Sequence, residues 1–229
     1  MNKLLKTIRQ SPLLARIVPF IIFIALTALQ DHTGLTGRYW CYLAKTVVVG
    51  WMLWWLRPVI AEMRWKLSWE GVVTGVAVFV LWVGLDEALV WLGFKNSYPK
   101  WNFGGGAWMP QAVFGAGLAW FINLARLVGS SVVVPPLEEV FFRSFVYRYL
   151  KKNDFLSVPL GQFMWGPFVI TAVIFGFEHK EWLAGILCAF AFQGLVCWKN
   201  RLGDAITAHA VTNALLGLWV ITRGAWHFW

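Results

Sequence analysis

Residues 111–150 read QAVFGAGLAWFINLARLVGSSVVVPPLEEVFFRSFVYRYL. The first part, 111–134, is mainly apolar and has Arg126 as its one charged residue, whereas acidic and basic side chains interrupt the second part. A helix needs about 20 mainly apolar residues to cross about 30 Å of hydrocarbon. A proline pair suits the first turn of a helix, where N–H groups lack helical partners. We therefore predict a membrane helix at 111–134 and a second, shorter helix at 136–150.

Apolar runs recur on both sides of this stretch. Apolar residue types make up 59% of the 229 residues, charged residues make up 14%, and the mean hydropathy is +0.61. A soluble domain carries about 25% charged residues, so this composition argues against a soluble enzyme, a disordered chain or a nucleic-acid-binding module. We predict an all-α fold, a polytopic transmembrane helical bundle of about eight spans that forms a single domain over residues 1–229. The predicted spans are 13–30, 39–56, 69–92, 111–134, 136–150, 162–179, 182–198 and 204–222.

The charge pattern fits a protein embedded in a lipid bilayer. The net charge is +9, and 17 Trp residues are of the type that gathers at membrane–water boundaries. We expect an integral protein of a bacterial cell membrane that retains its first apolar helix and binds no nucleic acid. Lys and Arg divide almost equally between the two sides of the predicted bundle, so they do not fix its orientation. The longest connection, Lys95 to Met109, contains three consecutive glycines and is expected to be flexible.

The first cluster of polar residues in an apolar setting is Glu138, Glu139 and Arg143. Glu139 and Arg143 are four residues apart and share a helix face, so they can form an ion pair. Glu138 lies about 100° around the helix from Glu139 and is left to face something else. If the helix starts at the proline pair, both carboxylates also lie near the positive end of its dipole. The alternative is an ordinary solvated helix entrance.

Two further clusters place a histidine four residues from a neighbour on the same helix face. Phe175 and His179 end one apolar run, and His209 and Asn213 lie inside the last one. His179 can instead be a residue of the membrane interface, and His209 and Asn213 can instead form hydrogen bonds between helices. Polar side chains inside membrane segments are costly, and they are kept mainly where they face partners or a water-filled cavity.

Together the clusters supply one free carboxylate, two imidazoles and one amide from three separate helices. A carboxylate and a histidine can take a proton from water as a general base. A second histidine and an asparagine can donate hydrogen bonds to the charge that develops on a carbonyl oxygen. This set of groups indicates hydrolysis of a peptide bond within the membrane, in a membrane-associated protein or peptide substrate.

In this order, the three clusters resemble the CAAX protease and bacteriocin-processing family of intramembrane proteases, also called CPBP or Abi. The family pattern is Glu-Glu-x-x-x-Arg, then Phe-x-x-x-His, then His-x-x-x-Asn or Asp. The resemblance covers about residues 130–215, which we take as the catalytic core. The Trp-rich front end is similar to the bacterial group described as CAAX prenyl protease-related.

The resemblance implies an eight-helix bundle with a cavity, and it implies a role for each matched residue. Glu138 and His179 would activate the water, while His209 and Asn213 would hold the oxyanion. The remaining matched residues, Glu139, Arg143 and Phe175, would support the structure. Family members are often called metalloproteases, and Glu138, His179 and His209 could supply three zinc ligands. Dependence on glutamate alone and dependence on zinc therefore both stay open.

Other readings use the same or neighbouring residues. A transporter, a non-catalytic scaffold or an immunity factor could employ the same polar side chains. A serine protease would draw on Gly129-Ser130-Ser131, which lacks a Gly-x-Ser-x-Gly turn, and an aspartyl protease would need Asp86 and Asp204, which lie near span ends. A prenyltransferase would need Asp-rich pairs, and the sequence has none. Paired repeats, which transporters often show, are not evident either.

Overall fold

The computed structural model describes residues 3–30, 32–94 and 108–229, and within these ranges the chain is helical with no strand. The all-α prediction is therefore confirmed. Most of the predicted flexible connection, residues 95–107, lies outside the described residues. The α-helices are α1 (Lys3–Gln10), α2 (Pro12–Gln30), α3 (Gly34–Leu56), α4 (Trp69–Trp91), α5 (Ala116–Val128), α6 (Val134–Glu139), α7 (Tyr147–Tyr149), α8 (Trp165–Phe177), α9 (Trp182–Lys199) and α10 (Leu202–Arg223).

One long helix runs through the middle of the molecule, from Ala116 to Tyr149. It joins α5, α6 and α7 through two π-helical segments, η4 (Gly129–Val133) and η5 (Val140–Val146). The prediction of two helices at 111–134 and 136–150 is therefore wrong, because the proline pair lies inside a continuous helix. A π turn lies just before the prolines, and its wider geometry gives the rings room, whereas in a regular α-helix a proline ring clashes with the carbonyl group four residues earlier.

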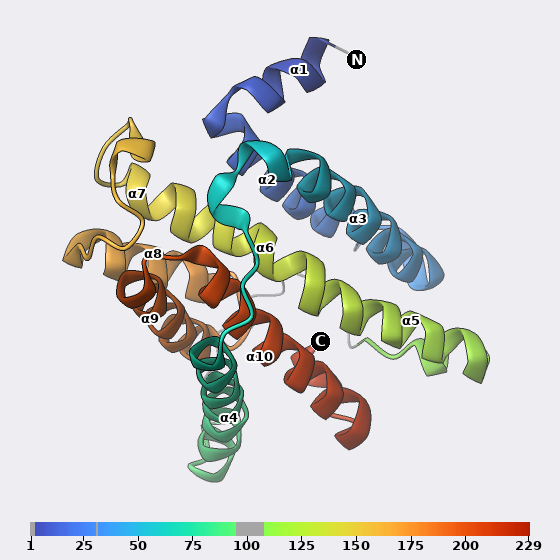
Figure 1. Cartoon of the computed structure of the whole chain (residues 1–229). Helices are drawn as coiled ribbons and strands as arrows, with labels where there is room; N and C mark the ends of the chain where they lie inside the picture. Colours follow the sequence, from blue (N-terminus) through green and yellow to red (C-terminus); the bar gives the residue numbers. More distant parts are fainter. Residues whose placement is uncertain (1–2, 31, 95–107) are drawn as a thin grey trace.

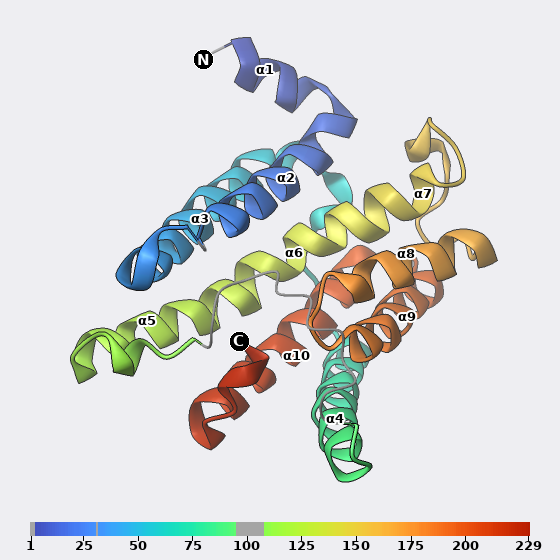
Figure 2. The ribbon, with the colours of Figure 1, turned by 180° about the vertical axis from the view of Figure 1, so that it is seen from behind.

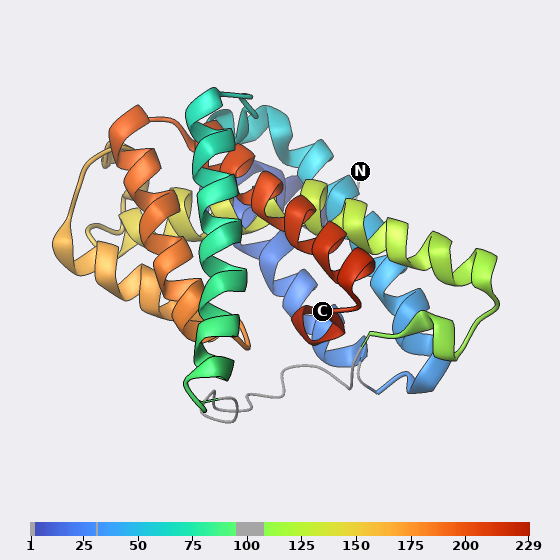
Figure 3. The ribbon, with the colours of Figure 1, turned by 90° about the horizontal axis from the view of Figure 1, so that it is seen from below.

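The long helix separates two groups of helices (Figures 1 and 2). Helices α1, α2 and α3 lie on one side, and α4, α8, α9 and α10 lie on the other. Within these groups α2 packs on α3, α8 on α9, and α4 on α10, which cross one another in Figure 3. Helix α10 also contacts α5, η4, α6 and α9. Residues on α10 therefore face the long helix and the second group at once.

Close helix packing sets the position of α10. A Cβ atom added to Gly75 would lie 2.5 Å from the carbonyl oxygen of Ala208, so only glycine allows α4 to approach α10 this closely. The hydroxyl of Thr212 donates a hydrogen bond of 2.9 Å to the carbonyl oxygen of Gly75 across the same contact. This contact fixes the position of α10, which carries His209 and Asn213.

Five helices in the described ranges are long and apolar enough to cross a membrane, so the count of about eight spans is not confirmed. Two predicted spans merge into one helix, α8 has only 13 residues, and α3 carries Arg38 and Lys45 in its sequence. The five helices are Pro12–Gln30, Trp69–Trp91, Ala116–Tyr149, Trp182–Lys199 and Leu202–Arg223. Their length and apolar character support an integral membrane protein.

A polar cluster around Glu62 ties the connection after α3 to the bundle. Glu62 Oε1 lies 2.6 Å from Arg16 Nη2 on α2 and 2.8 Å from Arg148 Nη2 on α7. The hydroxyl of Ser144 also donates to Glu62. Burial would raise the pKa of Glu62, but the positive charge of Arg16 and the hydrogen bonds from Ser144 and Arg16 hold that pKa below its ordinary value. The folded state therefore favours the charged carboxylate.

We expect Glu62→Gln to lower the free energy of unfolding by about 2–4 kcal/mol, because it leaves Arg16 and Arg148 without their carboxylate. Since the pKa of Glu62 is lower in the folded protein, its contribution is complete above the ordinary carboxyl pKa and is lost as the pH falls through the folded value. Thermal unfolding in detergent between pH 3 and pH 7 measures both effects. Asp154→Asn, in an exposed loop, is the control. A pH dependence that is the same in wild type and Glu62→Gln would contradict the assignment.

Candidate active site

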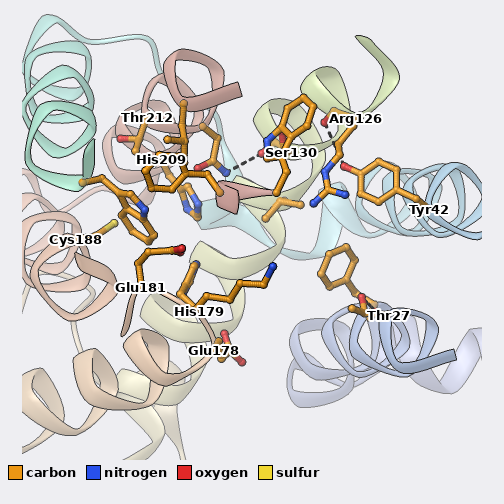
Figure 4. A pocket seen from close by; sticks show the side chains of 18 of the residues that line it. Thr27, Tyr42, Arg126, Ser130, Glu178, His179, Glu181, Cys188, His209 and Thr212 are labelled. Atoms are coloured by element: carbon orange, nitrogen blue, oxygen red, sulfur yellow. Dashed lines mark hydrogen bonds between the residues drawn. The ribbon is translucent and has the colours of Figure 1, made fainter. Parts of the chain in front are cut away.

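A cavity of about 310 Å³ opens between the two groups of helices (Figure 4). It is lined by four predicted site residues from α8, from the turn that follows α8 and from α10: Phe175, His179, His209 and Asn213. Glu138 lies at the edge of this group, with Oε2 3.9 Å from His209 Nε2. The volume is at the lower end of the range for ligand pockets. The chain thus brings its three separate polar clusters to one place.

Glu139 is the buried centre of the arrangement. Its Oε2 lies 3.2 Å from Arg143 Nε, so the ion pair predicted from the spacing is present, and both side chains are fully buried. Its Oε1 accepts a hydrogen bond of 2.9 Å from His209 Nδ1. This second contact was not predicted, because Glu139 and His209 are 70 residues apart in the sequence. One carboxylate therefore holds both an arginine on its own helix and a histidine on α10.

The guanidinium group of Arg143 lies over an aromatic ring. Its Cζ is 4.3 Å from the ring centroid of Phe175, a cation–π contact that partly replaces lost hydration. Within the described part of the chain, the Arg143 nitrogens form no hydrogen bond of good geometry. The ion pair with Glu139 and the contact with the Phe175 ring therefore stabilise this buried charge. Phe175 thus contributes to the structure of the cluster.

The contact with Glu139 sets the orientation of His209. A carboxylate oxygen accepts, so Nδ1 carries the proton that is donated to Glu139, and Nε2 points toward Glu138. The imidazole also stacks on Phe192, with ring centroids 5.2 Å apart. Glu139 and Phe192 thus hold the His209 ring in place, and its Nε2 is available on the cavity side.

His179 is fixed in a similar way by the backbone. Its Nδ1 lies 2.9 Å from the carbonyl oxygen of Phe175, one turn earlier. Because a carbonyl only accepts, Nδ1 carries a proton, and Nε2 of the neutral ring keeps a lone pair. The ring lies against Trp82 and Phe175, with centroids 5.4 and 4.8 Å away. His179 therefore lies in the cavity wall rather than at a lipid interface.

Asn213 contacts the backbone of the long helix. Its Nδ2 donates a hydrogen bond of 2.9 Å to the carbonyl oxygen of Ser130, a contact drawn in Figure 4. Val134 donates to the carbonyl of Gly129, and the next residue in this π register, Pro135, has no N–H to give to Ser130. The side chain of Asn213 replaces that missing donor. This bond compensates for the N–H that Pro135 lacks.

This arrangement corrects the expectation that Glu138 and Glu139 lie in the first turn of a helix. They follow 18 residues of α5 and η4, Ala116 to Val133, without a break, so no free helix N-terminus lies beside them. The electrostatic environment of these two carboxylates is set instead by Arg143, by His209 and by their burial. The helix dipole therefore has no special part in the site.

The residues do not form a preassembled metal centre. In the described ranges, no group of three or more His, Cys, Asp or Glu side chains is arranged to hold a metal ion. His209 Nδ1 is also already engaged with Glu139. Glu138, His179 and His209 therefore do not fit a three-ligand zinc site as they stand, and the sequence-based zinc site stays a prediction.

The residues of the rival protease types are engaged elsewhere. Asp204 pairs with Arg201 at 2.8 Å, and Asp86 lies 3.2 Å from His227, so the two aspartates have separate partners. The Ser130 hydroxyl donates to the carbonyl of Leu127. The geometry thus favours the Glu–His–Asn set over a serine or two-aspartate arrangement.

Comparison with known proteins gives a family match over the region that contains the three clusters. Residues 119–215 match the family model described as Type II CAAX prenyl endopeptidase Rce1-like. The match contains all three clusters and confirms the family resemblance that their order predicts. No curated protein and no solved structure matches the chain.

We expect Asn213→Ala to lower the free energy of unfolding by about 1–3 kcal/mol, because the partly buried Ser130 carbonyl loses its donor. The same change should cost less when Pro135 is replaced by Ala, because residue 135 then has an N–H to donate within the helix. A double-mutant cycle on thermal or denaturant unfolding measures this coupling. Equal costs of Asn213→Ala in the two backgrounds would show that the asparagine does not serve the proline position.

Proposed function

We propose, from the premise that residues 119–215 belong to the family of Rce1-like type II CAAX prenyl endopeptidases, that this chain is a glutamate-dependent intramembrane endopeptidase. Its substrate would be a membrane-associated protein or peptide. The observation that carries the proposal is the orientation of His209: Glu139 holds Nδ1, and Nε2 faces Glu138 at the edge of a cavity that also contains His179 and Asn213.

Glu138 and His179 are proposed to activate the attacking water. Glu138 makes no ion pair with Arg143, which lies against Glu139, and its Oε2 has no hydrogen-bond partner among the described residues. As a base, this carboxylate takes a proton from water while the water oxygen bonds to the carbonyl carbon of the substrate. The Nε2 of His179, left free by the bond from Nδ1 to the Phe175 carbonyl, can orient the same water.

His209 and Asn213 are proposed to stabilise the oxyanion that this attack creates. The contact of Nδ1 with Glu139 keeps His209 oriented, and a proton on its Nε2 would donate to the oxyanion. An amide NH₂ group has two donors, so Asn213 keeps one N–H besides the one that it gives to Ser130. When the intermediate collapses, the C–N bond breaks and the proton held by Glu138 passes to the leaving nitrogen.

No step of this proposal passes through a metal ion. Zinc would supply a Lewis acid and a bound hydroxide if Glu138, His179 and His209 rearranged to ligate it. The contact of His209 with Glu139 and the lack of a three-ligand group in the described ranges support the glutamate-dependent form.

We expect Glu138→Gln to abolish cleavage while the protein stays folded, because the amide keeps the shape of the side chain but cannot accept the proton. The assay incubates purified protein with membrane extract and sequences the shortened peptide termini. Glu87→Gln, an exposed position on α4, is the matched control and should cleave normally. Cleavage by Glu138→Gln at the wild-type rate would exclude Glu138 as the base, and a wild type that produces no new termini would favour a scaffold or transporter.

We expect His209→Ala and Asn213→Ala each to reduce kcat by about 10²–10³-fold, as the loss of an oxyanion donor does. KM should change much less, because these donors act mainly in the transition state. Both variants are measured at matched amounts of folded protein, which separates the rate effect from the stability effect of Asn213→Ala. A large increase in KM with an unchanged kcat would instead indicate a binding role.

A further inference from the structure

Contacts between helices show which helix ends lie on the same side of the bundle. The hydroxyl of Tyr42 on α3 donates a hydrogen bond of 3.2 Å to the carbonyl oxygen of Arg126. Further along α3, a Cβ atom added to Gly50 would lie 3.4 Å from the side chain of Val133. Helix α3 and the long helix therefore run in the same direction, and the polar cluster around Glu62 joins their C-terminal ends.

Helices α4 and α10 run the other way. Gly71 and Gly75 of α4 approach Asp204 and Ala208 of α10 in the same chain order, so these two helices are parallel to each other. The contacts of α10 with the long helix come in the opposite chain order, so α10 is antiparallel to it. The starts of α4 and α10 therefore lie on the same side as the ends of α3 and α7.

Three more ion or ring contacts place the remaining ends on this side. Arg16, near the start of α2, pairs with Glu62, and Arg9 of α1 lies over the ring of Trp55 at the end of α3. Lys199, the last residue of α9, pairs with a carboxylate in the first turn of α4. One side of the bundle thus holds α1, the starts of α2, α4 and α10, and the ends of α3, α7 and α9.

Lysine and arginine gather on this side, which we call the basic side. Besides Arg16 and Arg148, which pair with Glu62, it carries Lys3, Lys6 and Arg9 in α1, Arg57, Arg64 and Lys66 between α3 and α4, Lys151 and Lys152 after α7, and Lys199 and Arg201 around the end of α9. The described residues near the opposite helix ends include Arg38, Lys180 and Arg223, and the sequence of the connection between α4 and α5 adds Lys95 and Lys100.

The continuous long helix creates this difference between the two sides. The eight-span prediction divides the same residues almost equally, because it ends one span before the proline pair and begins another. A single helix in place of two moves the charges around Lys151 and Lys199 to the N-terminal side of the bundle. It moves Lys180 and Arg223 to the opposite side. Lys and Arg in short connections near span ends are retained on the cytoplasmic side of a membrane. The basic side therefore faces the cytoplasm.

The cavity lies in the other half of the bundle. It is lined from the end of α2, the start of α3, the first half of the long helix and the turn between α8 and α9. Exposed residues of that turn, Glu178 and Lys180, are part of the lining, so the cavity reaches the surface there (Figure 4). In the described ranges, no lining residue comes from the basic-side connections 57–68, 150–164 and 200–201.

We infer that the proposed active site opens toward the side of the membrane away from the cytoplasm, so that its substrate is a protein or peptide segment that has been carried across the membrane; this rests on the proposed protease function. The peptide bond reaches His179 and His209 past the turn between α8 and α9. On the basic side, the Glu62 cluster and the pair of Lys199 tie the helix ends together instead.

The orientation is tested with single cysteines and a maleimide that does not cross membranes. In a chain whose Cys41, Cys188 and Cys197 are replaced by alanine, His32→Cys marks the cavity half and Asn153→Cys marks the basic side. Both positions are exposed and both changes leave the Lys and Arg count unaltered. The cysteine-free chain is the control for background labelling.

In intact cells, His32→Cys should react and Asn153→Cys should react only after the membrane is made permeable. The reverse pattern, reaction of both positions in intact cells, or reaction of neither would overturn the inferred orientation.

The substrate class is tested with the wild-type chain, which keeps its own cysteines. A cleavage sequence found with the membrane extract is placed beside the single span of a reporter protein, on its exported side in one reporter and on its cytoplasmic side in the other. The wild type should cut the exported reporter and leave the cytoplasmic reporter intact, whereas Glu138→Gln should cut neither. Cleavage of the cytoplasmic reporter, alone or equally with the exported one, would overturn the inference.

The two experiments fail separately from the proposed catalytic function. If Glu138→Gln cuts the exported reporter as the wild type does, the catalytic assignment fails and the side of access stands. If cutting depends on Glu138 but occurs on the cytoplasmic reporter, the protease stands and the inferred side fails.

Discussion

The site depends on one buried carboxylate, that of Glu139. It pairs with Arg143 one turn further along the long helix and accepts a hydrogen bond from His209 on α10. Arg143 in turn lies on the ring of Phe175, which brings α8 into the same cluster. Removing one member of a buried ion pair typically costs about 3–5 kcal/mol, because the other charge is left without compensation. The contacts of Glu139 and of its partner Arg143 thus link the three helices that carry the matched clusters, and the contact with Glu139 also orients the imidazole of His209 toward Glu138.

A second interaction fits the long helix to α10. The π turn at Gly129–Val133 and the missing N–H of Pro135 leave the carbonyl of Ser130 exposed, and the side-chain amide of Asn213 donates a hydrogen bond to it. Ser130 and Glu139 therefore meet Asn213 and His209 in opposite chain order, as expected for two helices that run antiparallel here. The four-residue spacing of His209 and Asn213 has a structural meaning as well as the proposed chemical one. The irregular turn, the proline and the asparagine have to be considered as one unit.

Much of this arrangement could be predicted from local sequence, and the rest depends on contacts between distant segments. Hydropathy predicts an all-helical membrane protein, and the spacing of Glu139 and Arg143 predicts their pair, which is present. The merging of the helices at 111–134 and 136–150 could not be predicted, because the group that compensates Pro135 lies at residue 213. The contact of Glu139 with His209 has the same origin.

Acidic and basic side chains come together around one cavity. His179 and His209 line it, and Glu138 lies 3.9 Å from His209. The match of residues 119–215 to the Rce1-like family agrees with a protease of the CAAX type. Aromatic side chains take part throughout, under Arg143, beside His179 and around Arg126, and they let charged groups stay in a mainly apolar bundle. The contact between Glu139 and His209 is tested most directly by ¹⁵N NMR of the histidine side chains in detergent-solubilised protein. We expect His209 and His179 both to carry a proton on Nδ1, and Glu139→Gln to change the signals of His209 far more than those of His179. A His209 with its proton on Nε2 and no response to Glu139→Gln would contradict this contact.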